Sequence, residues 1–319
     1  MKMADVEKIT VNTFLQMKKQ GIKTAGLTGY DSSIAGIHAS AGKTPMDRID
    51  WILVGDSAGN TMFGYGTTTK VTMDEMERIT GYVKNGIDNA VKGGHVTYQP
   101  LLVGDMPINT YDNPKDGVYN AKRFIKAGAD AIKLEGGTRK GVGEVVKAIF
   151  DEGIPVMGHI GFTPQTANKL VDENVVQGKT IVGAKELIDD ALYLQANGAF
   201  AVLVECTPWK VGKRITDLAE IPIIGIGAGP KTDGQLLIVH DLINLTLGKP
   251  FKFVWQYNTK NAKEAIKKYA IDVKKGTKPK LSQSFTATEE VEKFIETYDP
   301  RLVYHTCCEH SCEHCEHKH

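Results

Sequence analysis

Five short apolar runs in the sequence each lead to a side chain that could move a proton or bind a metal ion. With one further lysine inside a run, these side chains are Asp56, Asp105, Lys133, Glu135, His159 and Glu205. A short apolar run that stops at a polar residue is typical of a buried parallel strand whose end opens into a loop. Because the carboxyl ends of parallel strands meet in one place, we expect these side chains to converge on one site.

The acidic residues among them indicate a divalent cation. Asp56 and Asp105 end apolar runs that are neighbours in the sequence, and carboxylates without cysteine partners favour a hard ion such as Mg²⁺. A bound Mg²⁺ could hold a 2-oxo acid through its oxo and carboxylate oxygens, polarise the carbonyl and stabilise an enolate. Glu205 would then be the base that removes the proton. A carboxylate that follows Ala-Val-Leu-Val is costly to bury without a partner, which makes a purely structural role for Glu205 hard to defend.

Structural roles for several of these residues stay open at this stage. Asp56 or Asp105 alone could cap a helix, and Ser57 could be a capping hydroxyl. Ser57 and Lys133 could instead bind the carboxylate of the substrate. Lys133 alternates with apolar neighbours, so it could equally pair with Glu135 or with another buried acid.

Two residues near the ends of later strands are also ambiguous. His159, in the run Gly-His-Ile-Gly, is explained as well by a hydrogen-bonded core histidine as by a substrate ligand. Cys206 follows Glu205 on a strand that should be buried. We therefore expect Cys206 to be a packed thiol rather than a nucleophile.

The elements that must position these residues alternate between strand and helix about eight times. Strands are expected near 23–28, 51–54, 101–105, 131–135, 156–159, 201–205 and 223–226, with an eighth apolar run of ambiguous type in 235–247. This α/β alternation with short connections predicts parallel strands, and eight units favour a closed (β/α)₈ barrel. A doubly wound open sheet is the alternative, but no Gly-x-Gly-x-x-Gly motif follows the first strand.

Local signals set several helix boundaries. Residues 4–20 predict a short amphipathic helix, with Thr10 or Asn12 as its cap. Thr72-Met-Asp-Glu75 is a capping box that begins a helix running to about Lys92. Residues 59–71, by contrast, are rich in glycine and threonine and predict a loop over the site.

Composition excludes several classes of protein. The chain of 319 residues carries 39 basic and 38 acidic residues, so its charge points to neither nucleic acid nor membrane as a partner. No apolar run approaches the roughly 20 residues of a membrane span, and the N-terminus lacks the apolar core of a signal peptide. Cys206 is the only cysteine before residue 307. Without a disulfide framework, the body of the chain fits a cytoplasmic protein.

Six motifs in the chain resemble those of one known family. In order they are Val54-Gly-Asp-Ser57, Lys133-Leu-Glu-Gly-Gly137, Gly158-His-Ile-Gly-Phe-Thr-Pro-Gln165, Val204-Glu-Cys-Thr-Pro208, Ile224-Gly-Ile-Gly-Ala-Gly229 and Thr232-Asp-Gly-Gln235. Any one of them is weak evidence, whereas six in the same order are specific. Over about residues 10–285 the chain resembles ketopantoate hydroxymethyltransferase, or 3-methyl-2-oxobutanoate hydroxymethyltransferase.

This resemblance implies a fold and a reaction. The fold is a (β/α)₈ TIM barrel of the phosphoenolpyruvate/pyruvate type, expected here over residues 1–285. The reaction transfers a hydroxymethyl group from 5,10-methylenetetrahydrofolate to 3-methyl-2-oxobutanoate through a Mg²⁺-bound enolate. Its product is 2-dehydropantoate, used in pantothenate and coenzyme A biosynthesis. The family also forms large homo-oligomers, so we expect one here.

The resemblance also assigns roles by position. Asp56 and Asp105 match the family's Mg²⁺ ligands, with Glu135 in or beside the metal shell. The residues that hold the oxo acid correspond to Ser57 and Lys133, and the proposed base corresponds to Glu205.

The chain departs from the family's pattern within 58–70, 108–109 and 171–176. These segments are expected to line the entrances for the oxo acid and the folate. If they alter the chemistry, the alternative is a Mg²⁺-dependent carbon–carbon lyase or aldolase that acts on another 2-oxo acid.

Residues 286–319 extend beyond the family's usual end and contain an expected helix around 288–297. The last fifteen residues are crowded with cysteine and histidine, and Cys308, Cys312 and Cys315 have a spacing that could bind Zn²⁺ or a similar thiophilic ion. A tail without bound metal is equally compatible with the sequence. The least favoured interpretation of the whole chain is a metal-binding protein that acts through this tail.

Overall fold

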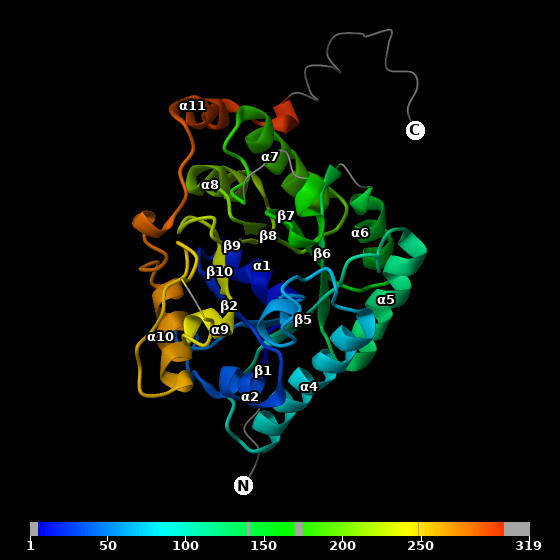
Figure 1. Cartoon of the computed structure of the whole chain (residues 1–319), viewed down its shortest axis with the longest axis vertical. Coiled ribbons are helices and arrows are strands. Elements are labelled where there is room, and N and C mark those ends of the chain that lie inside the picture. Colours follow the sequence, from blue (N-terminus) through cyan, green and yellow to red (C-terminus); the bar gives the residue numbers. More distant parts are fainter. Residues whose placement is uncertain (1–5, 139–140, 170–174, 248, 303–319) are drawn as a thin grey trace.

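A computed structural model describes residues 6–138, 141–169, 175–247 and 249–302. Its centre is a closed barrel of parallel strands in the order β10-β2-β3-β5-β6-β7-β8-β9, with β9 pairing back to β10 (Figure 1). Ring closure confirms the predicted barrel and excludes the open sheet. The barrel strands are β2 (Thr24–Thr28), β3 (Trp51–Val54), β5 (Leu101–Asp105), β6 (Ala131–Glu135), β7 (Val156–Gly161), β8 (Ala201–Glu205), β9 (Ile223–Ile226) and β10 (Gly234–Leu237).

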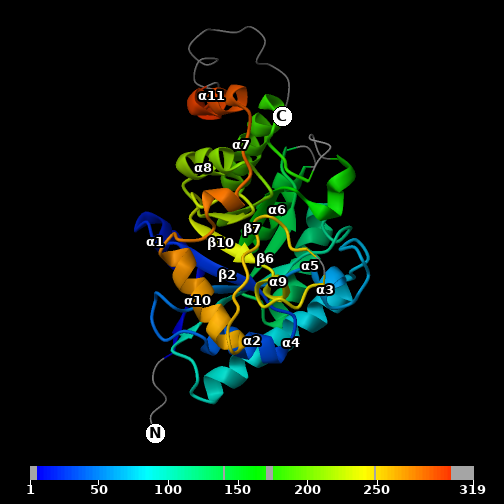
Figure 2. The ribbon, with the colours of Figure 1, turned by 60° about the vertical axis from the view of Figure 1, so that its left-hand side comes forward.

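Helices surround the barrel and connect its strands (Figures 1 and 2). They are α1 (Val11–Lys19), α2 (Ser32–Ser40), α3 (Ala58–Thr61), α4 (Met73–Lys92), α5 (Pro114–Ala127), α6 (Val142–Asp151), α7 (Ile181–Ala196), α8 (Trp209–Leu218), α9 (Val239–Leu242), α10 (Ala262–Lys274) and α11 (Glu289–Thr297). The described residues also contain the 3₁₀ segments η2 (Pro164–Lys169) and η3 (Leu281–Gln283). In the described residues, no helix is both long and apolar enough to cross a membrane.

Short-range signals set several helix ends, including those predicted at Thr10 and Thr72. Thr72 and Glu75 form the reciprocal capping box at the start of α4, and Thr10 caps α1. Asn113 caps α5, where Pro114 occupies the first turn. These caps satisfy backbone N–H groups that have no partner within the helix, so each fixes where the chain turns toward the barrel.

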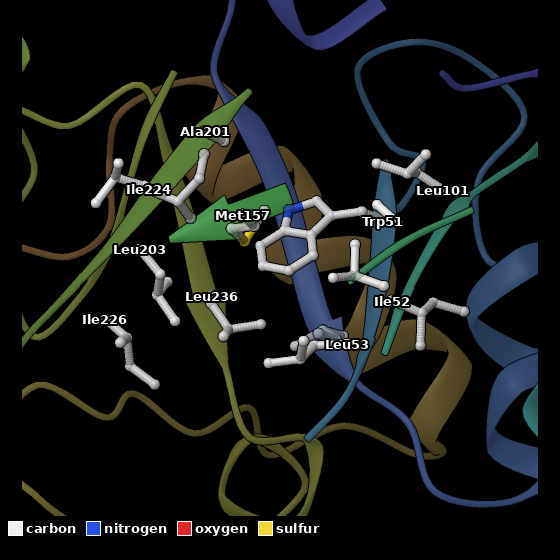
Figure 3. Packing of buried hydrophobic residues seen from close by; sticks show 14 of the residues in the cluster. Trp51, Ile52, Leu53, Leu101, Met157, Ala201, Leu203, Ile224, Ile226 and Leu236 are labelled. Atoms are coloured by element: carbon white, nitrogen blue, oxygen red, sulfur yellow. The ribbon is translucent and has the colours of Figure 1, made fainter. Parts of the chain in front are cut away.

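Toward the amino-terminal ends of the strands, the barrel interior is filled with apolar side chains. Figure 3 shows Trp51, Met157, Leu203 and Leu236, which come from four strands, projecting into the space that the barrel encloses. The Trp51 ring meets Phe14 of α1 edge to face, with ring centroids 6.2 Å apart. Edge-to-face packing of this kind is favourable beyond simple area burial. Helix α1 therefore closes the amino-terminal end of the barrel.

Two segments differ from the sequence-based predictions. The chain forms the one-turn helix α3 where a loop was predicted from residue 59. A Cβ atom on Gly59 would lie 2.5 Å from the Thr67 carbonyl oxygen, so this glycine permits close packing and does not mark an open loop. The ambiguous run near 235–247 divides into β10, which closes the ring, and the short helix α9.

A two-stranded sheet outside the barrel was not predicted. It pairs β1 (Glu7–Lys8) with β4 (Tyr98–Gln99). The helix predicted over residues 4–20 is therefore wrong at residues 7 and 8, and α1 covers only Val11–Lys19. Both strands have only two residues, too few to show a periodicity in sequence.

The described part of the C-terminal extension packs on the barrel's outer layer. Helix α11 contacts α7 and α8, and Figure 1 shows it at the same end of the molecule as those helices. Lys210 of α8 pairs with Glu292 at 2.7 Å, and the Tyr298 hydroxyl donates to Asp189 of α7 at 2.6 Å. Residues 303–319, which include Cys308, Cys312 and Cys315, lie outside the described residues.

Candidate active site

The predicted site residues come from five consecutive strands of the ring. Asp56 lies two residues after the end of β3, and the others lie near the carboxyl ends of β5, β6, β7 and β8. The strand register pairs Asp105 with Lys133, and Glu135 with His159. Side chains two residues apart on a strand share a face, so Lys133 and Glu135 point to the same side of β6.

Lys133 and Asp105 form a buried ion pair. The Lys133 Nζ atom lies 2.6 Å from Asp105 Oδ1, and both side chains are almost fully buried. Burial lowers the pKa of Lys133, but Asp105, Glu135 and Asp56 outweigh that effect and raise it above its ordinary value. Lys133 therefore stays charged. The sequence left open whether Lys133 pairs with Glu135 or with another buried acid, and the partner observed is Asp105.

Asp105 also fixes the start of the loop after β3. Its Oδ2 atom accepts a hydrogen bond from the Asp56 backbone N–H at 3.1 Å. Burial raises the pKa of Asp105 well above its ordinary value, against the opposing effect of Lys133. Burial, together with the nearby Glu135, also raises the pKa of Asp56. The two aspartates therefore lie in a region that disfavours further negative charge.

These charges fit a divalent cation. Asp56, Asp105 and Glu135 carry three formal negative charges, whereas Lys133 supplies one positive charge, so a dication would balance the cluster. The donors are hard oxygen atoms, which Mg²⁺ prefers. Among the described residues, no three His, Cys, Asp or Glu side chains form a ready-made metal-binding group. Any cation held by Asp56 and Asp105 would therefore need further oxygen ligands from outside the protein's own acids.

His159 lies between two glutamates. Its Nδ1 atom is 3.2 Å from Glu135 Oε1, and its Nε2 atom is 3.2 Å from Glu205 Oε2. The second contact has hydrogen-bond length but not hydrogen-bond alignment, so Nε2 has no aligned partner in the described part of the chain. Burial and the nearby Lys133 lower the pKa of His159, which favours the neutral ring.

Glu205 lies across the barrel from the aspartates. Its strand β8 is four positions from β3 in a ring of eight, and its side chain is 20% exposed, unlike the buried acids. A Cβ atom on Gly161 would lie 2.1 Å from the Glu205 carbonyl oxygen, and Gly161 has φ +92°. Only glycine suits both the crowding and the left-handed backbone, so it fixes the position of the Glu205 backbone. The next residue, Cys206, is buried, and burial raises the pKa of its thiol, as expected for a packed cysteine.

Ser57 is held by a tyrosine to which the sequence analysis gave no role. The Tyr30 hydroxyl and Ser57 Oγ lie 2.8 Å apart. Burial raises the pKa of Tyr30 to about 12, so this hydroxyl stays protonated. Ser57 precedes α3 but forms no side-chain cap with it. The capping role considered for Ser57 is therefore not observed.

Two more residues, Gln165 and Tyr111, also belong to this cluster and were missed. Gln165 closes the motif Gly158–Gln165, so the motif was visible in the sequence although the role of its last residue was not. Its side chain donates to Asp56 Oδ2 at 2.9 Å, and Tyr111 donates to its amide oxygen at 2.6 Å.

Comparisons with known proteins show the family to which the chain is similar. The model of a family described as ketopantoate hydroxymethyltransferase matches residues 8–281. A 3-methyl-2-oxobutanoate hydroxymethyltransferase from Syntrophomonas wolfei is 41% identical over 288 residues, covering 89% of this chain and 98% of the relative. One of the same name from Acetivibrio thermocellus is 42% identical over 283 residues, covering 88% of this chain and 93% of the relative.

Solved structures show a shared fold at low sequence identity. Oxaloacetate acetylhydrolase aligns with a TM-score of 0.52 and 14% identity, covering 86% of this chain and 100% of that chain. 2,3-Dimethylmalate lyase, a member of the PEP mutase/isocitrate lyase superfamily, aligns with a TM-score of 0.50 and 13% identity, covering 71% and 80%. These likenesses show a shared barrel fold. The family match and the relatives' identity over nearly their whole length show that the chain belongs to the ketopantoate hydroxymethyltransferase family.

Proposed function

We propose that this protein transfers a hydroxymethyl group from 5,10-methylenetetrahydrofolate to 3-methyl-2-oxobutanoate and so forms 2-dehydropantoate for pantothenate biosynthesis. The observation that carries the proposal is the placement of Glu205 across the barrel from the Asp56 and Asp105 carboxylates, in a chain of this family. That arrangement separates a site for the oxo acid's oxygens from a base that faces its carbon.

The divalent cation in this proposal is Mg²⁺ or a similar ion. Asp56 and Asp105 would hold it, with Glu135 beside them, because these are the oxygen donors in the buried excess of negative charge. When bound, such an ion supplies a Lewis acid for the oxo group of the substrate.

The protein's own groups carry the other steps. Lys133 and Ser57 bind the substrate's carboxylate, and Tyr30 orients the Ser57 hydroxyl. Glu205 removes the proton from C3 of the oxo acid. The resulting carbon nucleophile attacks the methylene carbon of the folate while the first of its two carbon–nitrogen bonds breaks, and a new carbon–carbon bond forms. Water then displaces the second folate nitrogen from that carbon, and the two nitrogens take up the C3 proton and one proton of the water, so that tetrahydrofolate leaves. Water supplies the oxygen of the new hydroxyl group.

Proton exchange tests the first step without the folate. The protein would be incubated with Mg²⁺ and 3-methyl-2-oxobutanoate in D₂O, and the C3 proton signal followed by NMR. We expect the signal to disappear faster than in a protein-free control. Addition of 5,10-methylenetetrahydrofolate should then give 2-dehydropantoate. Absence of exchange would overturn the proposal, and exchange without product would point to another acceptor of the carbon nucleophile.

The proposal includes a cytoplasmic location and a homo-oligomer. Support for the location is chemical: among the described residues, the one free cysteine is the buried Cys206, which suits a reducing compartment. Light scattering coupled to size-exclusion chromatography measures the oligomer directly. A mass equal to that of one chain would contradict the assembly.

A further inference from the structure

The Gln165 side chain forms hydrogen bonds within the acidic cluster through both its amide nitrogen and its amide oxygen. It is 4% exposed. Its Nε2 atom donates to Asp56 Oδ2 at 2.9 Å and to the Met106 carbonyl oxygen at 3.0 Å. Its backbone N–H donates to Glu135 Oε2 at 3.1 Å. One residue therefore holds two of the three carboxylates on which the proposed cation site depends.

Tyr111 determines which way the Gln165 amide points. The Tyr111 oxygen accepts the Glu135 backbone N–H at 3.3 Å, so its own hydrogen is available for Gln165 Oε1, 2.6 Å away. The other end of the amide faces two acceptors, Asp56 Oδ2 and the Met106 carbonyl, which require the two N–H donors of the amide. A reversed amide would place oxygen against oxygen at both positions.

This arrangement gives the two oxygen atoms of the Asp56 carboxylate different surroundings. The Oδ2 atom is held by Gln165, whereas Oδ1 accepts no hydrogen bond from any part of the chain that the structure describes. A carboxylate with one oxygen fixed cannot rotate freely, which lowers the entropic cost of binding an ion at the other oxygen. The same residue restrains Glu135 through its backbone.

We propose that Gln165 and Tyr111 form a positioning pair that sets the orientation of the Asp56 and Glu135 carboxylates for a divalent cation. Gln165 makes the direct contacts with the two carboxylates; Tyr111 accepts the Glu135 backbone N–H and reaches the carboxylates through Gln165. This inference rests on the proposed function, since it assumes that Asp56 binds the cation. Neither residue is assigned contact with the reacting atoms.

The test measures Mn²⁺ binding in the absence of substrate, from the electron paramagnetic resonance signal of the free ion. Gln165→Met keeps the length of the side chain and removes its side-chain hydrogen bonds to Asp56, Met106 and Tyr111, while the backbone N–H can still donate to Glu135. We expect its dissociation constant for Mn²⁺ to rise about 10–100-fold, as is typical when a group that orients a metal ligand is lost. Tyr111→Phe removes a single hydroxyl, and we expect a smaller rise of about 3–10-fold, on the scale of one hydrogen bond.

A double variant separates a positioning pair from two independent residues. If Tyr111 acts only through Gln165, then Gln165→Met with Tyr111→Phe should bind Mn²⁺ as weakly as Gln165→Met alone. If the increases in dissociation constant of the two single variants instead multiply in the double variant, Tyr111 acts independently of Gln165. That result would overturn the proposed pairing, although not the role of Gln165. If Gln165→Met does not fold, the single Tyr111→Phe variant decides the matter, and its unchanged affinity would overturn the proposal.

Two controls complete the design. Gln195→Met removes an amide on α7 that accepts the backbone N–H groups of Glu220 and Ile221, and it should leave Mn²⁺ affinity unchanged. Asp56→Asn should abolish tight binding. Unchanged Mn²⁺ affinity in folded Gln165→Met, with a lowered melting temperature, would show a merely structural role and overturn the inference alone. Lack of Mn²⁺ binding by the unaltered protein would overturn the cation site itself and the inference with it.

Discussion

His159 Nε2 and Glu205 Oε2 lie 3.2 Å apart without hydrogen-bond alignment. With Nδ1 directed at Glu135, a neutral His159 presents a lone pair at Nε2. An ionised Glu205 cannot donate to that lone pair, but a protonated Glu205 can. His159 therefore faces Glu135 through one ring nitrogen and Glu205 through the other.

Glu205→Gln should abolish the base while preserving the site. The new amide can donate to His159 Nε2 much as a protonated glutamate would, so we expect the variant to fold and to bind the oxo acid. Exchange of the C3 proton in D₂O should slow by about 10²–10⁴-fold, the usual contribution of a positioned base. NMR measures the exchange rate.

The matched control for this variant is Glu152→Gln, which removes a surface carboxylate paired with Lys122. It should exchange at the unaltered rate. If Glu205→Gln also exchanged at the unaltered rate, another group would have to be the base.

Tyr30→Phe should weaken substrate binding more than it slows turnover. The change removes the hydroxyl beside Ser57 Oγ, and one neutral hydrogen bond contributes about 0.5–1.5 kcal/mol. We therefore expect KM for 3-methyl-2-oxobutanoate to rise about 2–10-fold with kcat nearly unchanged. Steady-state kinetics measure both constants, with the exposed Tyr82→Phe as control. A fall in kcat with constant KM would place Tyr30 in the chemical step instead.

Stability should fall in mild acid because of His38. Burial lowers the pKa of His38 to about 4, below the value of about 6.5 expected when the chain unfolds. Between these values the unfolded chain binds the proton more readily, so stability is complete above about pH 6.5 and declines as the pH falls toward 4. At pH 5 the loss from this residue is about 2 kcal/mol.

Urea titrations at pH 7 and pH 5 measure that loss. In His38→Gln the difference in unfolding free energy between the two pH values should shrink by about 2 kcal/mol. An unchanged difference would mean that His38 is not responsible for the acid sensitivity.

The tail gives a spectroscopic prediction that depends on sequence alone. If Cys308, Cys312 and Cys315 bind a thiophilic ion, Co²⁺ should produce a thiolate charge-transfer band. Replacement of the three cysteines by serine should remove the band and leave proton exchange intact. Absence of the band in the unaltered chain would end the idea of a metal-binding tail.

The strands and most helix ends could be predicted because their signals are local. The apolar run 51–54 and the capping box at Thr72 each lie within a few residues of the feature they determine. Strand β10 could not be assigned from its own residues, because only two of its four residues have apolar side chains. Its strand character follows from pairing with both β9 and β2, which depends on ring closure.

The site was predictable in its residue types but not in its pairings. The sequence places Lys133 among acids, yet only the register of β5 against β6 selects Asp105 as its partner. Gln165 was missed for a related reason. Its partners, at residues 56, 106, 111 and 135, come from separate segments, and no spacing in the sequence connects them.

The barrel interior changes along its axis, from the apolar layer around Trp51 to the charged layer of Asp105 and Lys133. Replacing a buried ion pair with apolar side chains of similar volume often leaves a protein as stable or makes it more stable. The charged layer is thus a place where activity and stability compete. In a thermostabilisation screen without selection for activity, we expect substitutions such as Asp105→Leu with Lys133→Met among the stabilised variants. Selection for activity should exclude them. The difference in stability between such variants and the unaltered enzyme would measure the stability that the enzyme loses by keeping its charged layer.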